Sequence, residues 1–422
     1  MAFYVLGLDG TPFSLISEYI DAGIMPNFKS YIDQSESSFV PLLSSYPPIS
    51  SVAWTSFMTA SNPAEHGIFG FMDFNRPSYS LTFPNSKDRK KKTLWEIIAE
   101  KNMTSAVINL PSTYPATPIN GLMVSGFVAL ELEKSVYPLS FYRDLKDMKY
   151  RIDVDLTKAK DLDFLVKDLI EMLEIREKSF RLTLKDKYDL WIGVITETDR
   201  LLHFMHHAIT DKSNIYHSFV MEYFNKIDKL FGRLVDDFFD ENPFIMLSDH
   251  GFTGLKQEIY INNWLIENNL MVLNKSHPAS IEDISGKSLF MSLDPGRIYL
   301  NKREIFENGL EISEEDCKKY LDDLESKLFT LKYNNEAVIE KVFRKEDIYK
   351  GEFLDIAPDM VILPKHGYDL KARLNTKEVF NSTHITGCHT YDNAFRITNQ
   401  LMPECISIQN VGEYILNFLL DY

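Results

Sequence analysis

The stretch "FYVLGLDG", at residues 3–10, decides the fold. Its apolar run has the length of one buried strand and ends in Asp-Gly, a pair typical of a turn. The residues that follow, "TPFSLISEYIDAG" (11–23), combine a Thr-Pro start, apolar residues at helical spacing and a terminal glycine. This pattern predicts a helix. A strand followed directly by a helix is the unit from which α/β proteins are built.

The same unit recurs along the chain. Helical patterns precede three further apolar runs, "TSAVINLP" (104–111), "LWIGVITETD" (190–199) and "PFIMLSDHG" (243–251). Strands that alternate with helices form a parallel sheet, because each helix carries the chain back to the edge where the next strand begins. The sequence therefore predicts an α/β fold with a central, mostly parallel sheet.

The region 261–360 interrupts this alternation. It contains an acidic helical segment, "SEEDCKKYLDDLESKLF" (313–329), and we expect the alternation to resume with "PDMVILP" (358–364). We therefore predict an α/β core made of residues 1–260 and 361–422. Residues 261–360 are expected to form an inserted cap region rather than an independent domain.

The composition excludes several classes of protein. Of 422 residues, 45% are hydrophobic and 25% charged, as in an ordinary globular protein. The net charge of −16 argues against a surface that coats nucleic acid. It does not argue against a phosphorylated small-molecule substrate, because a bound metal ion reverses the local potential.

The cysteines and the apolar runs indicate the compartment. Cys317, Cys388 and Cys405 are too few and too scattered for a disulfide framework or a thiolate zinc site. The first residues lack the basic segment of a signal peptide, and no apolar run approaches the roughly 18 residues of a membrane span. We expect a protein of the reducing cytoplasm with no membrane span.

Chemically capable side chains follow three of the predicted strands. Asp9, Asp199 and the pair Asp249-His250 stand at their ends. Ligands of open α/β sheets bind beyond the carboxyl ends of the strands, so we expect these side chains to gather there.

Each of these residues also has an ordinary structural explanation. Asp199 and His203 share one face of a helix, but an Asp cap followed by an exposed His has the same spacing. Asp249-His250 can be a simple strand-to-turn junction, and His389, in "STHITGCHTYDNAF" (382–395), a loop or core histidine. Together, three carboxylates and three histidines suit two divalent ions bound by oxygen and imidazole.

The stretch "PPISSVAWTSFMT" (47–59) has five hydroxyl side chains. By itself it leaves open whether it is a polar loop or supplies a nucleophile.

Five blocks in chain order carry a resemblance to a known family: "LGLDG" (6–10), "PPISSVAWTSFMTASNPAEHGIFGF" (47–71), "TETDRLLH" (196–203), "LSDHGF" (247–252) and "TGCHTYDNAF" (386–395). The chain resembles the alkaline phosphatase superfamily, in particular the type I phosphodiesterase/nucleotide pyrophosphatase branch with its bacterial and archaeal relatives. The resemblance spans nearly the whole chain and implies a three-layer sandwich around the central sheet.

The resemblance also implies roles for single residues. Ser50 matches the family nucleophile, and Thr55 and Ser56 then fall on the helix behind it. The implied ligands of two divalent ions, zinc first and manganese second, are Asp199, His203 and His389 for one ion and Asp9, Asp249 and His250 for the other. Ser50 also coordinates metal in this scheme, which would lower the pKa of its hydroxyl.

The implied activity is that of a metal-dependent phosphohydrolase, a phosphodiesterase or nucleotide pyrophosphatase. It would form a phospho-Ser50 intermediate and act on a phosphorylated, nucleotide-linked small molecule. Three alternatives stay open: a phosphomutase of the cofactor-independent phosphoglycerate mutase type, a phosphomonoesterase, and a non-catalytic binding protein that kept the fold.

The chain departs from the family at the phosphate clamp. Phe71 stands where nucleotide pyrophosphatases usually place an asparagine, and Arg76 follows shortly after. Phe71 and Arg76 are therefore the candidate substrate-binding residues, with Arg396 as a second candidate arginine.

Overall fold

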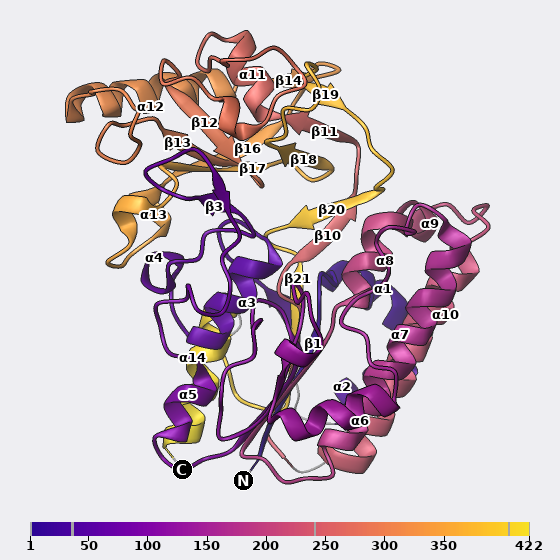
Figure 1. Ribbon diagram of the computed structural model, residues 1–422. Helices are drawn as coiled ribbons and strands as arrows, with labels where there is room; N and C mark the ends of the chain where they lie inside the picture. The colour runs from indigo at the N-terminus through magenta and orange to yellow at the C-terminus, as the bar shows by residue number, and fades with distance from the viewer. Residues whose placement is uncertain (1, 35–37, 240–241, 404–405, 422) are drawn as a thin grey trace. The chain divides into compact units, whose positions relative to one another are not determined.

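A computed structural model describes residues 2–34, 38–239, 242–403 and 406–421 (Figure 1). The chain forms two compact units. Unit 1 comprises residues 1–61, 85–254 and 384–422, and unit 2 comprises residues 62–84 and 255–383. The expected insertion at 261–360 lies within unit 2, which also includes residues 62–84, 255–260 and 361–383.

Unit 1 is built on a central sheet, in which the described residues form eight strands. In spatial order these are β2 (Ser38–Leu42), β21 (Ala394–Thr398), β9 (Phe244–Leu247), β1 (Phe3–Leu8), β8 (Leu190–Ile195), β5 (Ser105–Leu110), β6 (Gly121–Ser125) and β7 (Val136–Tyr137). The strands from β9 to β6 are parallel to one another. β2–β21, β21–β9 and β6–β7 pair antiparallel. The predicted α/β fold with a mostly parallel sheet is confirmed.

The register of the sheet brings three strand ends together. β1 lies in the middle and pairs with β8 from Phe3 opposite Leu190 to Leu8 opposite Ile195. On its other side β1 pairs with β9, where Gly7 lies opposite Leu247. The residues that follow these strands therefore meet at one edge of the sheet.

Helices cover both faces of the sheet (Figure 1). One face carries α3 (Ser50–Thr59), α5 (Leu94–Ala99) and α14 (Ile408–Leu420). The other carries α1 (Phe13–Asp21), α2 (Pro26–Gln34), α6 (Tyr142–Asp147), α7 (Leu162–Thr183), α8 (Glu197–Met205), α9 (His207–Thr210) and α10 (His217–Leu234). Side chains of β1 alternate between the faces, because Phe3 and Val5 join one apolar cluster while Leu6 and Leu8 join the other.

Unit 1 also contains a short ribbon, β10 (Gly251–Gly254) paired antiparallel with β20 (Gly387–Thr390). Its short helical turns are η1 (Glu133–Ser135), η2 (Leu139–Phe141) and the π-helical η3 (Val235–Phe239).

Unit 2 has its own apolar cluster and several smaller sheets. Its largest sheet has the order β12 (Phe290–Leu293), β13 (Arg297–Leu300), β17 (Met360–Pro364), β16 (Ile339–Arg344). A second has the order β18 (Tyr368–Lys371), β11 (Gln257–Tyr260), β19 (Phe380–Asn381). The other elements are β3 (Asp73–Phe74), β4 (Leu81–Thr82), β14 (Lys332–Tyr333), β15 (Glu336–Ala337), α4 (Pro63–His66), α11 (Ile261–Glu267), α12 (Glu314–Leu328), α13 (Lys345–Ile348), η4 (Ile281–Asp283) and η5 (Leu354–Ile356).

The expected return of the α/β alternation at residues 358–364 is wrong. The strand exists as β17, but it pairs antiparallel with β13 and β16 in unit 2. An apolar run predicts a buried strand without specifying which sheet it joins. Between β16 and β17 the chain forms only the short α13 and η5, which are too short for a crossover to a parallel position.

Two further expectations concern cysteines and membranes. Cys317 is a free thiol, Cys388 is buried on β20, and Cys405 lies outside the described residues. Among the helices that the structure describes, none combines the length and the apolarity needed to cross a membrane.

The burial of the central strands determines which substitutions should destabilise the protein. Ile192 on β8 is fully buried, so Ile192→Ala should lower the free energy of unfolding by about 2–5 kcal/mol. The matched control is Ile215→Ala at a side chain that is 83% exposed, which should change it by no more than about 0.5 kcal/mol. Urea denaturation of both variants measures the difference, and equal effects would contradict the assigned core.

Candidate active site

Three carboxylates meet at the edge of the sheet where β1, β8 and β9 end. Asp9 follows β1, Asp249 follows β9 after one residue, and Asp199 lies in the first turn of α8, which begins just after β8. All three are buried, with at most 3% of each residue exposed. The sequence-predicted carboxylates are thus brought together.

Each carboxylate has one oxygen fixed by a hydrogen-bond donor. The three pairs are Trp54 Nε1 to Asp9 Oδ2 (2.9 Å), Gly10 N to Asp249 Oδ1 (3.0 Å) and Arg200 Nη1 to Asp199 Oδ2 (2.7 Å). The other oxygens of Asp199 and Asp249 accept no hydrogen bond within the part of the chain that the structure describes. A buried carboxylate oxygen without a donor calls for a cation.

Three histidines each direct one ring nitrogen to a backbone carbonyl. The pairs are His203 Nδ1 to Gly387 O (3.2 Å), His250 Nδ1 to Gly251 O (3.1 Å) and His389 Nδ1 to Pro48 O (3.1 Å). A carbonyl only accepts hydrogen bonds, so in each neutral ring the proton resides on Nδ1. The Nε2 atoms are left with lone pairs, the state in which histidine binds a metal.

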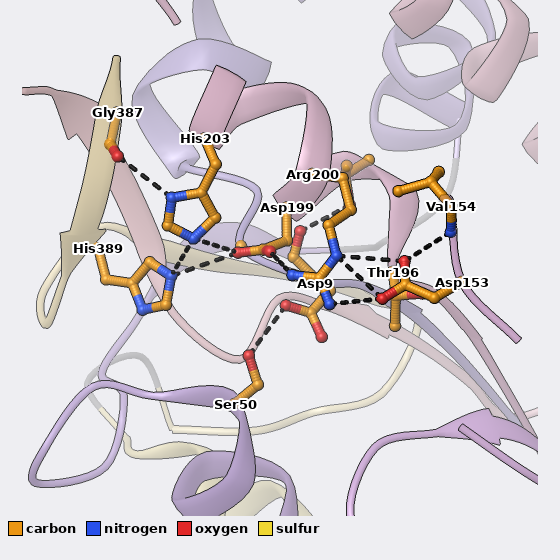
Figure 2. A network of polar contacts seen from close by, with 12 residues as sticks. Asp9, Ser50, Asp153, Val154, Thr196, Asp199, Arg200, His203, Gly387 and His389 are labelled. Atoms are coloured by element: carbon orange, nitrogen blue, oxygen red, sulfur yellow. Dashed lines mark hydrogen bonds and ion pairs between the residues drawn. The ribbon is translucent and has the colours of Figure 1, made fainter. Parts of the chain in front are cut away.

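These lone pairs converge with the carboxylates (Figure 2). His203 Nε2 lies 3.0 Å from His389 Nε2, and the two nitrogens lie 3.4 Å and 3.3 Å from Asp199 Oδ1. Three acceptors this close repel one another unless a cation lies among them. The residues therefore fit a divalent ion held by one oxygen and two imidazoles.

A second group of possible ligands shares Asp199. Ligand atoms of Asp9, Asp199 and His250 all lie within 4.8 Å of one another. Asp249 Oδ2 lies 3.4 Å from His250 Nε2 and joins this side of the site. The donor set again consists of carboxylate oxygen and imidazole nitrogen, which suits zinc and also accommodates manganese.

The electrostatics show why the cluster needs positive charge. Burial, together with the charges of Asp249 and Asp199, raises the pKa of Asp9 well above its usual range. Burial also raises the pKa of Asp249 to about 7, and it lowers the pKa of His250. For Asp199 burial is outweighed by His203 and His389 when these carry protons, and by Arg200, so its pKa is lowered. A bound cation would take the place of those protons. Divalent ions would keep all three carboxylates ionised.

Ser50 is the hydroxyl that faces this cluster. It is the first residue of α3, and its Oγ lies 3.2 Å from both Asp9 Oδ1 and His250 Nε2. The Thr55 and Thr59 hydroxyls instead donate to backbone carbonyls four residues earlier in α3. Thr55 and Ser56 lie on this helix, as expected.

Two glycines allow the close approach of the segments. Gly10 has a φ of +66°, and a Cβ there would lie 3.2 Å from Asp199 Oδ1. A Cβ on Gly387 would lie 2.4 Å from the carbonyl oxygen of Leu202 on α8. Gly387 therefore lets β20 pack against α8, which places His389 beside His203.

The candidate substrate-binding residues lie in unit 2. Arg76 Nη2 donates to Asp73 Oδ1 (3.1 Å) and to Ile356 O (3.0 Å), and Phe71 is half-buried. Their contact with a substrate stays a prediction. In unit 1, Arg396 is fully buried on β21 and donates to Pro403 O.

Sequence reasoning missed Trp54 and Arg200. Both stand inside the quoted blocks, Trp54 one helical turn after Ser50 and Arg200 directly after Asp199. Their spacing was the available signal, but only the structure shows that each holds a carboxylate oxygen.

Comparison with known proteins decides the family. The sequence model described as "Type I phosphodiesterase / nucleotide pyrophosphatase" matches residues 4–392. The chain belongs to this family. It is therefore a hydrolase of phosphoric ester or pyrophosphate bonds. None of the curated proteins matches the chain.

Solved structures share the fold. Phosphonoacetate hydrolase from Sinorhizobium meliloti 1021 is 14% identical with a TM-score of 0.63, over 99% of this chain and 96% of that chain. Murine ectonucleotide pyrophosphatase/phosphodiesterase 5 is 14% identical with a TM-score of 0.56, over 100% and 95%. The human protein of that name is 13% identical with a TM-score of 0.57, over the same shares. These likenesses support the alkaline-phosphatase-like fold.

The converging histidines lead to a prediction about metal content. His389→Ala removes one of the three ligand atoms that Asp199, His203 and His389 offer, so it should weaken binding of one divalent ion by at least about tenfold. The metal content measured by elemental analysis after dialysis should then fall from about two ions per chain toward one. His384→Ala is the matched control from the same segment, because His384 stacks on Phe204 outside the cluster. Equal metal content in both variants would refute the assignment.

Proposed function

We propose that the protein is a metal-dependent phosphodiesterase or nucleotide pyrophosphatase that uses Ser50 as its nucleophile. The observation that carries the proposal is the position of Ser50 Oγ, 3.2 Å from both Asp9 Oδ1 and His250 Nε2 within the buried cluster. A serine hydroxyl near neutral pH is a poor nucleophile unless its surroundings stabilise the ionised form. These surroundings supply the ligands of a cation that would do so.

The ligands of the two ions follow the family pattern. We assign Asp199, His203 and His389 to one ion and Asp9, Asp249, His250 and Ser50 to the other. When bound, zinc or manganese would lower the pKa of the Ser50 hydroxyl and stabilise negative charge on the attacking and leaving oxygens.

The chain's own groups position the reaction. Helix α3 begins at Ser50, so the positive end of its dipole favours a phosphate at the nucleophile. Ser50 Oγ loses its proton to solvent and attacks phosphorus, and the bond from phosphorus to the leaving oxygen breaks as that oxygen takes a proton from solvent. Water then hydrolyses the phospho-Ser50 ester and restores the hydroxyl. The substrate is a phosphorylated small molecule, which we infer to be nucleotide-linked.

The position of unit 2 in the sequence favours a hydrolase over a phosphomutase. Mutases of the cofactor-independent type carry their second domain between the nucleophile and the second metal block. Between Ser50 and Asp199, only residues 62–84 belong to unit 2, whose larger part is residues 255–383. We place the protein in the reducing cytoplasm, because its three cysteines, Cys317, Cys388 and Cys405, are too few and too scattered for a disulfide framework.

Removal of the nucleophile gives a direct test. Ser50→Ala should lower the rate of hydrolysis of bis-p-nitrophenyl phosphate by at least about a thousandfold, because loss of the nucleophile costs other hydrolases up to about a millionfold. The matched controls on the same helix are Ser51→Ala and Thr55→Ala, which should retain most of the activity. A fully active Ser50→Ala protein would overturn the assignment.

The kind of ester and the fate of the phosphoryl group form a second test. Initial rates on a phosphodiester, a nucleotide pyrophosphate and a phosphomonoester are compared with zinc or manganese added. We expect the diester and the pyrophosphate to be the better substrates. A preference for the monoester would favour a phosphomonoesterase, and phosphoryl transfer within one substrate without hydrolysis would favour a phosphomutase.

A further inference from the structure

We propose that Arg200, itself held by Asp153, is a positioning residue of the candidate metal centre. It binds Asp199 Oδ2 and so fixes the carboxylate with Oδ1 facing the two histidines. The inference rests on the proposed metal binding and extends it to residues outside the ligand set.

All three nitrogens of the Arg200 guanidinium have partners within the protein (Figure 2). Nη1 donates to Asp199 Oδ2 at 2.7 Å, and Nη2 donates to Asp153 Oδ2 at 2.7 Å. Nε lies 3.2 Å and 3.1 Å from the two oxygens of Asp153. The planar group also lies over the ring of Phe127, 4.4 Å from its centre. A guanidinium engaged in this way orients a carboxylate rather than binding a substrate phosphate.

Asp153 is in turn fixed by helix α7. The segment 151–155 is irregular, and two side chains of α7 hold its backbone. Asp168 accepts from the N–H of Asp155 (2.8 Å), and Arg176 Nη1 donates to the carbonyl of Arg151 (2.8 Å). Asp153 therefore presents its carboxylate to Arg200 from a fixed position, which a lone surface acid does not do.

The same arginine of α7 also holds the start of α8. Arg176 pairs with Glu197 at 2.9 Å, and both side chains are fully buried. Glu197 and Arg200 are about one turn apart on α8, and Asp199 lies between them. The two ion pairs thus fix the rotation of α8 about its axis, and with it the direction of Asp199 and His203.

The charges support a role in metal binding rather than in folding alone. Without Arg200, Asp199 Oδ2 would lose its donor, and the unpaired charge of Asp153 would face the acidic cluster. The carboxylate of Asp199 could then rotate away from the histidines. Groups that orient metal ligands in this way change metal affinity by about 10–100-fold when removed.

The experiment measures metal affinity and folding separately. Zinc and manganese affinities are determined by chelator competition for the parent protein, Arg200→Gln, Arg200→Lys and Asp153→Asn, and metal-free samples are melted in parallel. Arg200→Gln should weaken the binding of one of the two ions by about 10–100-fold. Arg200→Lys should restore part of this loss, because an ammonium keeps the charge but not the fork.

The matched control is Arg233→Gln. Arg233 also makes a two-pronged pair, with Glu177 at 2.8 Å, but on the exposed surface of unit 1. This variant should keep the metal affinity of the parent within about twofold.

The outcomes separate this inference from the proposed function. A folded parent that binds no divalent ion would refute the metal centre itself. A parent that binds two ions and a folded Arg200→Gln protein that binds both with parental affinity would refute only the role of Arg200. If Arg200→Gln does not fold, Asp153→Asn tests the inference instead, because loss of the Asp153 charge alone should weaken the binding of one ion by about tenfold. A folded Asp153→Asn protein that binds both ions with parental affinity would then refute the positioning role of Arg200.

Discussion

The mutual repulsion of three buried carboxylates is the constraint on which the rest of the site depends. Asp9, Asp199 and Asp249 lie at the ends of neighbouring strands with little access to water. One oxygen of each is bound by a donor, so the other oxygens are directed to a common region. Three histidines face backbone carbonyls with Nδ1, so their Nε2 atoms turn toward the same region. Positive charge at its centre would keep the three carboxylates ionised, and the proposed divalent ions would supply that charge.

Most of unit 1 could be predicted from the sequence, because its signals are local. The runs that form β1, β8 and β9 are apolar throughout, as strands buried on both faces must be. The pairing of β17 could not be predicted, since its apolar run would also suit the central sheet. Which strand pairs with which depends on contacts between distant segments, such as β13 with β17, and no local pattern reports them.

In the candidate site, too, some residues could be predicted from local sequence signals and others could not. The carboxylates and histidines were predicted because residues of these types follow strands or occupy family blocks. Trp54, Arg200 and Asp153 were not, because their roles depend on side-chain direction and on the packing of α7, α8 and the segment 151–155. The choice of Ser50 came from the resemblance. The structure adds a physical reason, since the hydroxyls of Thr55 and Thr59 are already bound to the backbone of α3.

The long segment between the last two ligand blocks is compatible with a fixed site because of where the chain leaves and re-enters unit 1. Residues 255–383 belong to unit 2, yet the strands on either side of them, β10 and β20, are hydrogen-bonded neighbours. Gly254 lies opposite Gly387, and Phe252 lies opposite His389. The pairing of β10 with β20 therefore joins the two ends of segment 255–383 before the chain reaches His389. A longer segment would add little to the entropic cost of this closure, because that cost grows only slowly with loop length. The position of His389 relative to His203 is set by β10 and α8, so the intervening segment can vary in size while the ligand geometry stays constant.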